Sequence, residues 1–154
     1  MKIADVISGL KTYLTNLSWT SDDGEGTTSF SGVYTFPNYE HDGGYPFAVI
    51  LDESGSGSSV DNRNVSFDTT ITVSICVNYA TIDKQTESEQ IEEAMLRLRE
   101  AWDYLKTQLF KYTTMNTLGV DWAYEPGFVD DFNSELNLYM RTITLVVKEN
   151  ISRG

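Results

Sequence analysis

The sequence predicts an α+β protein, with one mostly antiparallel sheet of about five strands and two main helices packed on one face. Three segments predict this class. Residues 2–17 and 87–111 carry apolar side chains at helical spacing, and residues 65–79 alternate apolar and polar side chains at strand spacing. With the shorter apolar segments, the order is helix, three strands, long helix, two strands. The 154 residues are expected to form one domain.

The first part of the chain is expected to hold a helix, a loop and a short strand. The helix at 2–17 has one apolar face, which comprises Ile3, Val6, Ile7, Leu10, Leu14 and Leu17. Residues 18–31 are rich in Ser, Thr, Gly and Asp without apolar periodicity, so they are predicted to be a loop. A strand at 32–36 is stopped by Pro37.

The next two strands are expected to form an extended hairpin. Residues 47–51 are all apolar, which predicts a strand covered on both faces. Residues 65–79 would span about 50 Å at ~3.4 Å per residue, so one end should project from a small domain. Residues 53–64, with the sequence ESGSGSSVDNRN, have the Gly and Ser content of a flexible arm.

The second helix and a fourth strand follow. Thr86 and Glu89 have the spacing of a capping box at the start of the helix at 87–111. Residues 120–124 are predicted to be a strand, ended by a turn at residues 125–127.

The last strand, at residues 136–149, changes its alternation near Arg141. Its apolar residues are even-numbered before this position and odd-numbered after it: Leu136, Leu138 and Met140, then Ile143, Leu145 and Val147. Either a β-bulge near Arg141 or a change of the covered face would explain the shift.

The charge of the chain disfavours nucleic-acid binding. Its apolar segments are too short for membrane insertion to be expected. The net charge is -12, and no Lys or Arg lies between Lys11 and Arg63. Binding to phosphate backbones needs clustered basic residues, which are absent from the sequence. No apolar stretch approaches the ~20 residues of a membrane span, and no signal peptide is recognised. The chain is expected to be soluble and, with a single cysteine, free of internal disulfides.

A search for catalytic chemistry predicts no catalytic residues, cofactor or metal. His41 is the only histidine and lies in a Gly/Asp turn, so it is interpreted as a surface residue. Cys76 lies in a strand without a neighbouring base, so it is interpreted as a structural thiol. Three acidic pairs leave a small calcium-binding or carboxylate-dependent module as the alternative from another class: Asp22–Asp23, Asp52–Glu53 and Asp130–Asp131.

Two segments are candidate partner interfaces. The arm at 53–64 has nothing of its own to bury, and the segment at 122–132 places aromatic residues in a turn flanked by acids, which is typical of a contact surface. Alternatively, those aromatic residues cap the core. The candidate residues are Ser54, Ser56, Ser58, Val60, Arg63, Trp122, Tyr124, Phe128 and Phe132.

The order of elements resembles that of the tail-terminator, or tail-completion, proteins of long-tailed bacteriophages. The resemblance is carried by the first helix and by the segments GYPFAVILDESG, TTITVSICVNYA, EEAMLRLREAWDYLK and MRTITLVVKEN. It covers most of the chain and consists of apolar patterns. Neck proteins of the head-to-tail connector share much of it, so a connector adaptor protein is the alternative.

The resemblance implies a structural virion protein, made in the host cytoplasm and located in the tail at the head-to-tail junction. It implies a hexameric ring that caps the tail tube and joins it to the head, with the tail tube protein and a connector protein as partners. DNA would only pass through the lumen, and the acidic stretch between Lys11 and Arg63 would line it. The arm at 53–64 would become ordered against a neighbouring subunit or the tube.

Overall fold

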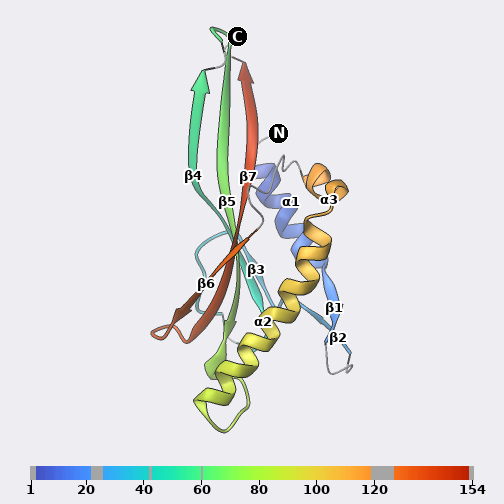
Figure 1. Ribbon diagram of the computed structural model, residues 1–154, viewed down its shortest axis with the longest axis vertical. Coiled ribbons are helices and arrows are strands. Elements are labelled where there is room, and N and C mark those ends of the chain that lie inside the picture. The colour runs from blue at the N-terminus through green and yellow to red at the C-terminus, as the bar shows by residue number, and fades with distance from the viewer. Residues whose placement is uncertain (1–2, 22–25, 42, 60, 119–126, 153–154) are drawn as a thin grey trace.

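The computed structural model describes residues 3–21, 26–41, 43–59, 61–118 and 127–152, and it confirms the predicted fold class (Figure 1). A five-stranded sheet has the order β3-β4-β5-β7-β6; only the β3–β4 pair is parallel. Helices α1 and α2 pack against the sheet. The elements are α1 (Ile3–Asn16), β1 (Ser18–Thr20), β2 (Thr27–Ser29), β3 (Val33–Tyr34), β4 (Phe47–Ser59), β5 (Asn64–Asn78), the 3-10 helix η1 (Tyr79–Thr81), α2 (Glu87–Leu109), α3 (Tyr112–Leu118), β6 (Phe128–Asn133) and β7 (Leu138–Ser152).

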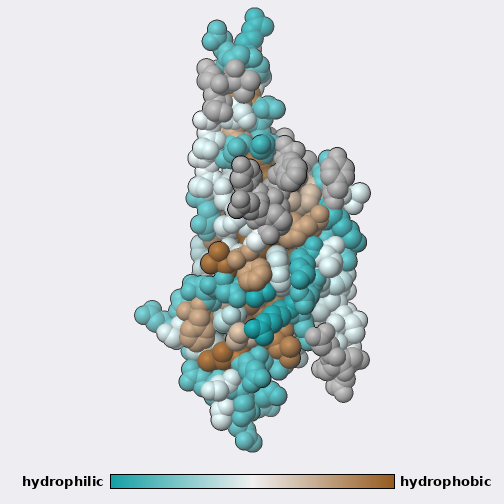
Figure 2. Space-filling view, viewed as in Figure 1, coloured by the Kyte–Doolittle hydropathy of each residue, from teal (hydrophilic) through white to brown (hydrophobic). Residues whose placement is uncertain are grey.

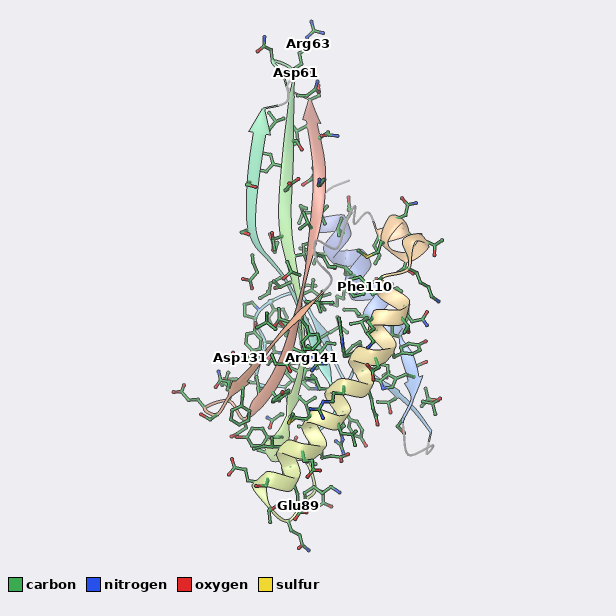
Figure 3. All side chains as sticks on the ribbon, viewed as in Figure 1. Asp61, Arg63, Glu89, Phe110, Asp131 and Arg141 are labelled. Atoms are coloured by element: carbon green, nitrogen blue, oxygen red, sulfur yellow. The ribbon has the colours of Figure 1, made fainter. Side chains whose placement is uncertain are left out.

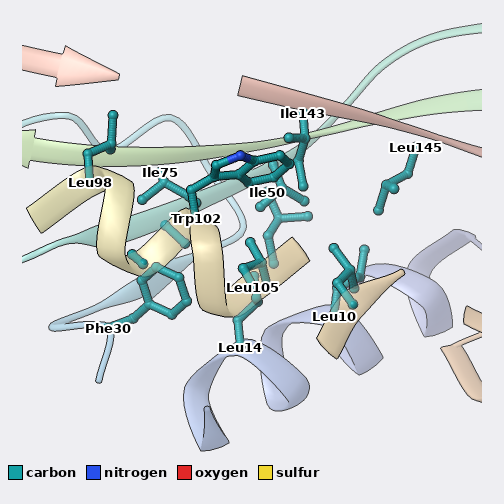
Figure 4. Close-up of a cluster of buried hydrophobic side chains, with 14 of the residues drawn as sticks. Leu10, Leu14, Phe30, Ile50, Ile75, Leu98, Trp102, Leu105, Ile143 and Leu145 are labelled. Carbon is teal, nitrogen blue, oxygen red and sulfur yellow. The ribbon is translucent and has the colours of Figure 1, made fainter. Parts of the chain in front are cut away.

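The main core lies between the helices and one face of the sheet (Figure 4). Helix α1 buries Val6, Leu10 and Leu14, the face that its apolar spacing predicts. Helix α2 is capped as expected, since the Thr86 hydroxyl accepts a hydrogen bond from the backbone N–H of Glu89 at 3.2 Å. The deepest side chains of α2 pack on the sheet: Ala94, Leu98, Ala101, Leu105 and Leu109 are fully buried.

Strand β4 is covered on both faces, as the apolar run at 47–51 predicts. Ala48 and Ile50 belong to the core under the helices. Phe47 and Val49 belong to a second, smaller cluster on the opposite face, together with Cys76 and Leu138. The amino-terminal half of β4 is therefore a central strand buried on both sides.

The shift of alternation in β7 is a change of the covered face. The register between β5 and β7 is continuous from Leu138 to Ser152, so β7 has no bulge against β5. Leu138 and Met140 pack in the second cluster, whereas Ile143 and Leu145 pack under the helices. The irregularity lies in β4, where the pairing with β5 shifts between Asp52 and Ser54.

Two sequence predictions differ from the structure, and a third lies outside the described residues. Residues 18–31 contain the β1–β2 hairpin, because Trp19 packs against Phe30 with ring centroids 5.2 Å apart. Strand β3 is shorter than the predicted 32–36. The strand predicted at 120–124 lies outside the described residues; β6 lies where the aromatic turn was expected.

In place of an unpaired arm at 53–64, the described residues of this segment continue the hairpin, with β4 extending to Ser59 and β5 beginning at Asn64. Strand β4 pairs with β5 as far as Ser59↔Val65. At the turn, Asp61 Oδ1 accepts hydrogen bonds from the backbone N–H groups of Arg63 and Asn64, at 2.7 and 2.8 Å, and the Arg63 N–H is the main cause of a lowered Asp61 pKa. A strand ladder satisfies the backbone of a Ser/Gly segment, which composition alone does not reveal. The predicted extended hairpin is confirmed.

Cys76 is expected to be unreactive in the folded protein. Its side chain is fully buried, and burial raises the pKa of the thiol to about 12. At pH 8 an aromatic disulfide reagent should therefore label it only after unfolding, in guanidinium. Absorbance measurements on native and denatured protein check this, and rapid labelling of the native chain would contradict the buried position.

Candidate interaction surfaces

The sheet extends beyond the helices as a three-stranded projection, which we call the blade (Figure 1). It consists of residues 54–59 of β4, 64–70 of β5 and 146–152 of β7, paired in continuous antiparallel ladders. Two apolar side chains of the blade are substantially exposed, Phe67 at 39% and Ile151 at 46%. Neither residue belongs to a core cluster, and among the described side chains of the blade only Val147, at its base, is buried in the core under the helices.

The two faces of the blade differ in chemistry. On the helix side, the Phe67 ring lies over Gly57, where an added Cβ would stand 2.8 Å from a ring carbon. The opposite face carries mainly small hydroxyl side chains. It forms an open groove of about 490 Å³ lined by Ser54, Gly55, Ser56, Asp68, Thr70, Val146 and Lys148. In Figure 2 the visible surface of the blade is mostly hydrophilic or neutral.

Both outer edges of the blade lack a neighbouring strand within the described residues. Strand β3 pairs with β4 only at Ala48 and Val49. Strand β6 pairs with β7 only as far as Ile143. The backbone of β4 beyond this point, and that of β7 at residues 144–151, therefore present an edge to which another strand can bind.

A second candidate surface follows β6; we call it the β6 patch and define it as Phe128, Val129, Phe132 and Leu136, with Val129 on the opposite face of the strand from the two phenylalanines. These side chains are exposed by between 37% and 72%. Phe128 contacts Trp102 edge to face, with ring centroids 5.5 Å apart, and Phe132 stacks on Tyr79 at 5.5 Å. Each aromatic ring is thus half anchored and half exposed, which suits a contact surface with a fixed shape.

An ion pair holds β6 to the sheet. Arg141 is 7% exposed, and its Nε and Nη2 donate to Asp130 Oδ1 and Oδ2 at 2.8 and 3.0 Å. The Tyr139 hydroxyl also donates to Asp130, at 3.2 Å, and the guanidinium of Arg141 lies 3.7 Å from the centre of the Phe128 ring. The hydrogen bond from Arg141 is the main reason that the pKa of Asp130 lies below its ordinary value.

The candidate residues from the sequence divide between these two surfaces. Ser54 and Ser56 lie on the blade, and Arg63 lies in the turn at its tip (Figure 3). Phe128 and Phe132 lie in β6, at the other end of the sheet, so the structure does not bring the two groups together. Ser58 is placed in β4 by its backbone, and its side chain is not described. Val60, Trp122 and Tyr124 lie outside the described residues.

Sequence reasoning missed Phe67, Ile151 and Arg141. Phe67 continues the alternation of β5 past the core, and this continuation was the available signal. Arg141 shares the odd-numbered face with Ile143 and Leu145, and an arginine in an apolar face indicates a buried partner. Asp130 could not be identified as that partner without the register of β6.

His41 is partly exposed and belongs to a hydrogen-bonded group, which its interpretation as a surface residue did not include. Its Nε2 lies 3.0 Å from Ser31 Oγ, and its Nδ1 lies 2.5 Å from the Tyr34 hydroxyl. Ser31 Oγ also lies 3.1 Å from the carbonyl oxygen of Pro46. Ser31 and Tyr34 lie before the segment that joins β3 to β4, whereas His41 and Pro46 lie within it. These contacts therefore fasten that segment to β3.

Neither a metal-binding group nor a membrane-spanning helix is found among the described residues. Within the described ranges, no group of three or more His, Cys, Asp or Glu side chains could hold a metal ion. Of the acidic pairs, Asp22–Asp23 lies outside those ranges, and Asp130 is engaged by Arg141. No helix of the described residues is long and apolar enough to span a membrane.

Comparison with solved structures finds a weak likeness, and the two sequence comparisons find none. No protein-family model matches the chain, and no curated protein sequence matches it. Among solved structures, the chain is similar to the sheath/tube terminator, in the extended state, of an extracellular contractile injection system named PVC, studied by cryo-EM. The identity is 11%, the match covers 99% of this chain and 58% of that chain, and the TM-score is 0.35. The chain thus spans less than two thirds of that protein, and a TM-score of this size does not establish a shared fold.

Proposed function

We propose that this chain is a structural assembly protein that forms a ring on the end of a tail tube and joins the tube to the head. The blade is the observation that carries the proposal. Apart from Val147 at its base it lies beyond the buried core, it exposes Phe67 and Ile151, and both of its edges are open within the described residues. A surface with these properties is typical of a protein that binds another polypeptide.

The blade lies almost wholly outside the buried core, which supports the proposal. The buried residues of β4 end at Ile50, those of β5 begin at Ile71, and those of β7 end at Val147. Ordering a backbone costs roughly 1–2 kcal/mol per residue, and in the isolated chain the blade recovers little of this by apolar burial. Contact with a partner would supply the missing burial.

The resemblance of the sequence to tail-terminator proteins suggests which partners the chain binds. The helix and strand segments that resemble tail-terminator proteins form α1, β4, β5, α2 and β7, the elements that build the sheet and its helical layer. By this proposal the ring is hexameric, its partners are the tail tube protein and a head-to-tail connector protein, and DNA passes through its lumen. The protein then belongs to the virion, at the junction of head and tail.

The β6 patch supplies a second contact surface. It lies at the opposite end of the sheet from the blade tip, so the two surfaces can engage different partners at the same time. This arrangement suits a protein that stands between a tube and a connector. The half-anchored rings of Phe128 and Phe132 would be its central contacts.

Tube growth in vitro tests the proposal. Cognate tail tube protein is polymerised with and without this protein, and tube lengths are measured in negative stain. Addition of the protein should stop elongation and leave shorter tubes in proportion to the amount added. Unchanged tube lengths over a range of molar ratios, with binding to purified connector instead, would reject the terminator role and assign the chain to the connector.

A further inference from the structure

We propose that neighbouring copies in the ring are joined blade to blade, by pairing of the outer edge of β4 in one copy with the outer edge of β7 in the next. This inference deepens the proposed function, because it names the joint between the subunits of the proposed ring. The partner of each edge is a second copy of this chain, and the blades together would form a closed barrel around the channel.

The β4 edge of the blade lacks the protection that free edge strands usually have. Proteins usually guard a free edge strand with charged residues, prolines or a covering segment. The β4 edge from Ser54 to Ser59 contains only serine and glycine. The β7 edge at residues 144–151 contains one lysine and one glutamate, Lys148 and Glu149, which cancel. The residues of the joint itself therefore carry no net charge.

Strand direction gives the second argument. Strands β4 and β7 are both antiparallel to β5, so they run in the same direction at the two edges of the blade. Rotation about a ring axis along the strands carries the β4 edge of one copy to the β7 edge of the next with both still pointing the same way. The joint is therefore parallel and uses two different edges, and such a head-to-tail contact closes into a ring when the rotation fits.

Side-chain size gives the third argument. On the helix side, the outer strand β4 has Gly55 and Gly57, which carry no side chain and pair with Thr69 and Phe67. On the same side, β7 has Ile151, which pairs with Val65 and is 46% exposed, whereas Val147, which pairs with Thr69, is buried in its own copy. Glycine in a strand permits close approach of another chain. Ile151 of one copy can therefore pack beside Gly55 and the exposed part of the Phe67 ring of the next copy.

The orientation of the faces assigns the channel lining. Helices occupy one face of the sheet, so they must lie outside the barrel, and the opposite face must line the channel. In the blade and just below it, this face carries the hydroxyl side chains of Ser54, Ser56, Thr70, Thr72, Thr142 and Thr144. Uncharged hydroxyl groups give DNA phosphates few cations to bind, so DNA could slide through.

This lining differs from the acidic lumen expected from the sequence. Asp52 pairs with Ile71, whose side chain lies under the helices, so Asp52 lies on the outer face. Glu53 accepts a hydrogen bond from the Thr72 hydroxyl at 3.3 Å and therefore faces the channel, together with Asp68 and Lys148. The channel wall of the blade is thus mostly neutral.

Engineered cysteine pairs test the joint. The variant Ser56→Cys/Lys148→Cys places one thiol on each outer strand, both on the channel face. Within one copy β5 lies between them, so they stand roughly 9–10 Å apart, beyond the reach of a disulfide. A disulfide can then form only between copies. Cys76 does not compete, because it is buried and its thiol pKa is raised to about 12.

The stagger between parallel strands is covered by a small scan. Cysteine at position 54 or 56 is combined with cysteine at position 144, 146 or 148, and each variant is oxidised alone and with tail tubes. At least one pair is expected to give a ladder of covalent multimers on a denaturing gel that ends at the closed ring. Each single-cysteine variant is the matched control and should stay monomeric on the gel.

Two results would overturn the joint. Covalent dimers from a single-cysteine variant would mean that like edges pair, and absence of ladders in every pair, with or without tubes, would mean that the edges do not meet. Rings that form without any crosslink leave the proposed function standing and remove this inference. Ladders that never cap tubes support the joint and remove the terminator function.

Discussion

Shortening the blade is expected to abolish assembly and to leave the fold intact. In the variant considered, residues 57–67 are replaced by Asn-Gly and the chain ends after Lys148. Ser56 and Asp68 are paired in the hairpin, so a two-residue turn can join them. The variant keeps every buried residue of the described core, including Ile71 and Val147. Circular dichroism should show a cooperative transition with a melting temperature lowered by less than about 5 °C.

Assembly of the shortened variant is measured by light scattering after size exclusion and by its effect on tube growth. It should remain monomeric and leave tube lengths unchanged, because most of the open edge of the blade is gone, together with the exposed Phe67 and Ile151. The full-length protein is the control in both assays. Rings formed by the shortened variant would show that the blade is not the joint. A variant that fails to fold would show that the blade supports the core, against the burial described above.

Replacing Asp130 with alanine is expected to lower the free energy of unfolding by about 2–3 kcal/mol. The change leaves the buried guanidinium of Arg141 without its two charge-assisted hydrogen bonds, and loss of one partner of a buried pair typically costs ~3–5 kcal/mol. The lower figure applies because the Asp130 side chain is 27% exposed. Urea unfolding measures the difference. The matched control is Asp131→Ala, which removes the same charge from an exposed neighbour on the other face of β6.

The same pair predicts a pH dependence. The pKa of Asp130 in the folded state lies below its ordinary value of 3.8, mainly because Arg141 donates to the carboxylate. A group with a lowered pKa stabilises the fold above its ordinary pKa, and this contribution is lost as the pH falls through the folded-state value. The stability difference between wild type and Asp130→Asn should therefore be constant from pH 7 to about pH 5 and shrink below about pH 4. A difference that persists unchanged at pH 3 would contradict the assignment.

The sequence predicts the helices and the long hairpin because their patterns are local and strong. Residues 65–79 alternate over nearly the whole of β5, and the helical face of α2 begins at a recognisable cap at Thr86. The length of β5 alone predicts that one end projects. The burial of β4 on both faces follows from its unbroken apolar run at 47–51.

The candidate surfaces are harder to predict from the sequence, because they depend on pairing between segments that are distant along the chain. Strand β6 contains adjacent acids, Asp130 and Asp131, which indicate a turn until Arg141 is known to pair with the first of them. The Ser/Gly segment of β4 resembles a flexible arm until its ladder with β5 is known. The hairpin of β1 and β2 likewise depends on contact between Trp19 and Phe30.

Imaging of tube ends tests the central proposal most directly. Purified tail tubes are mixed with the full-length protein, and tube ends are classified and averaged from negative-stain or cryo-EM images. The proposal predicts a single ring at one end of each tube, with the blades around the channel and the helices on the outside. Tubes whose two ends remain bare at saturating protein, beside a protein that light scattering shows to be monomeric, would contradict it.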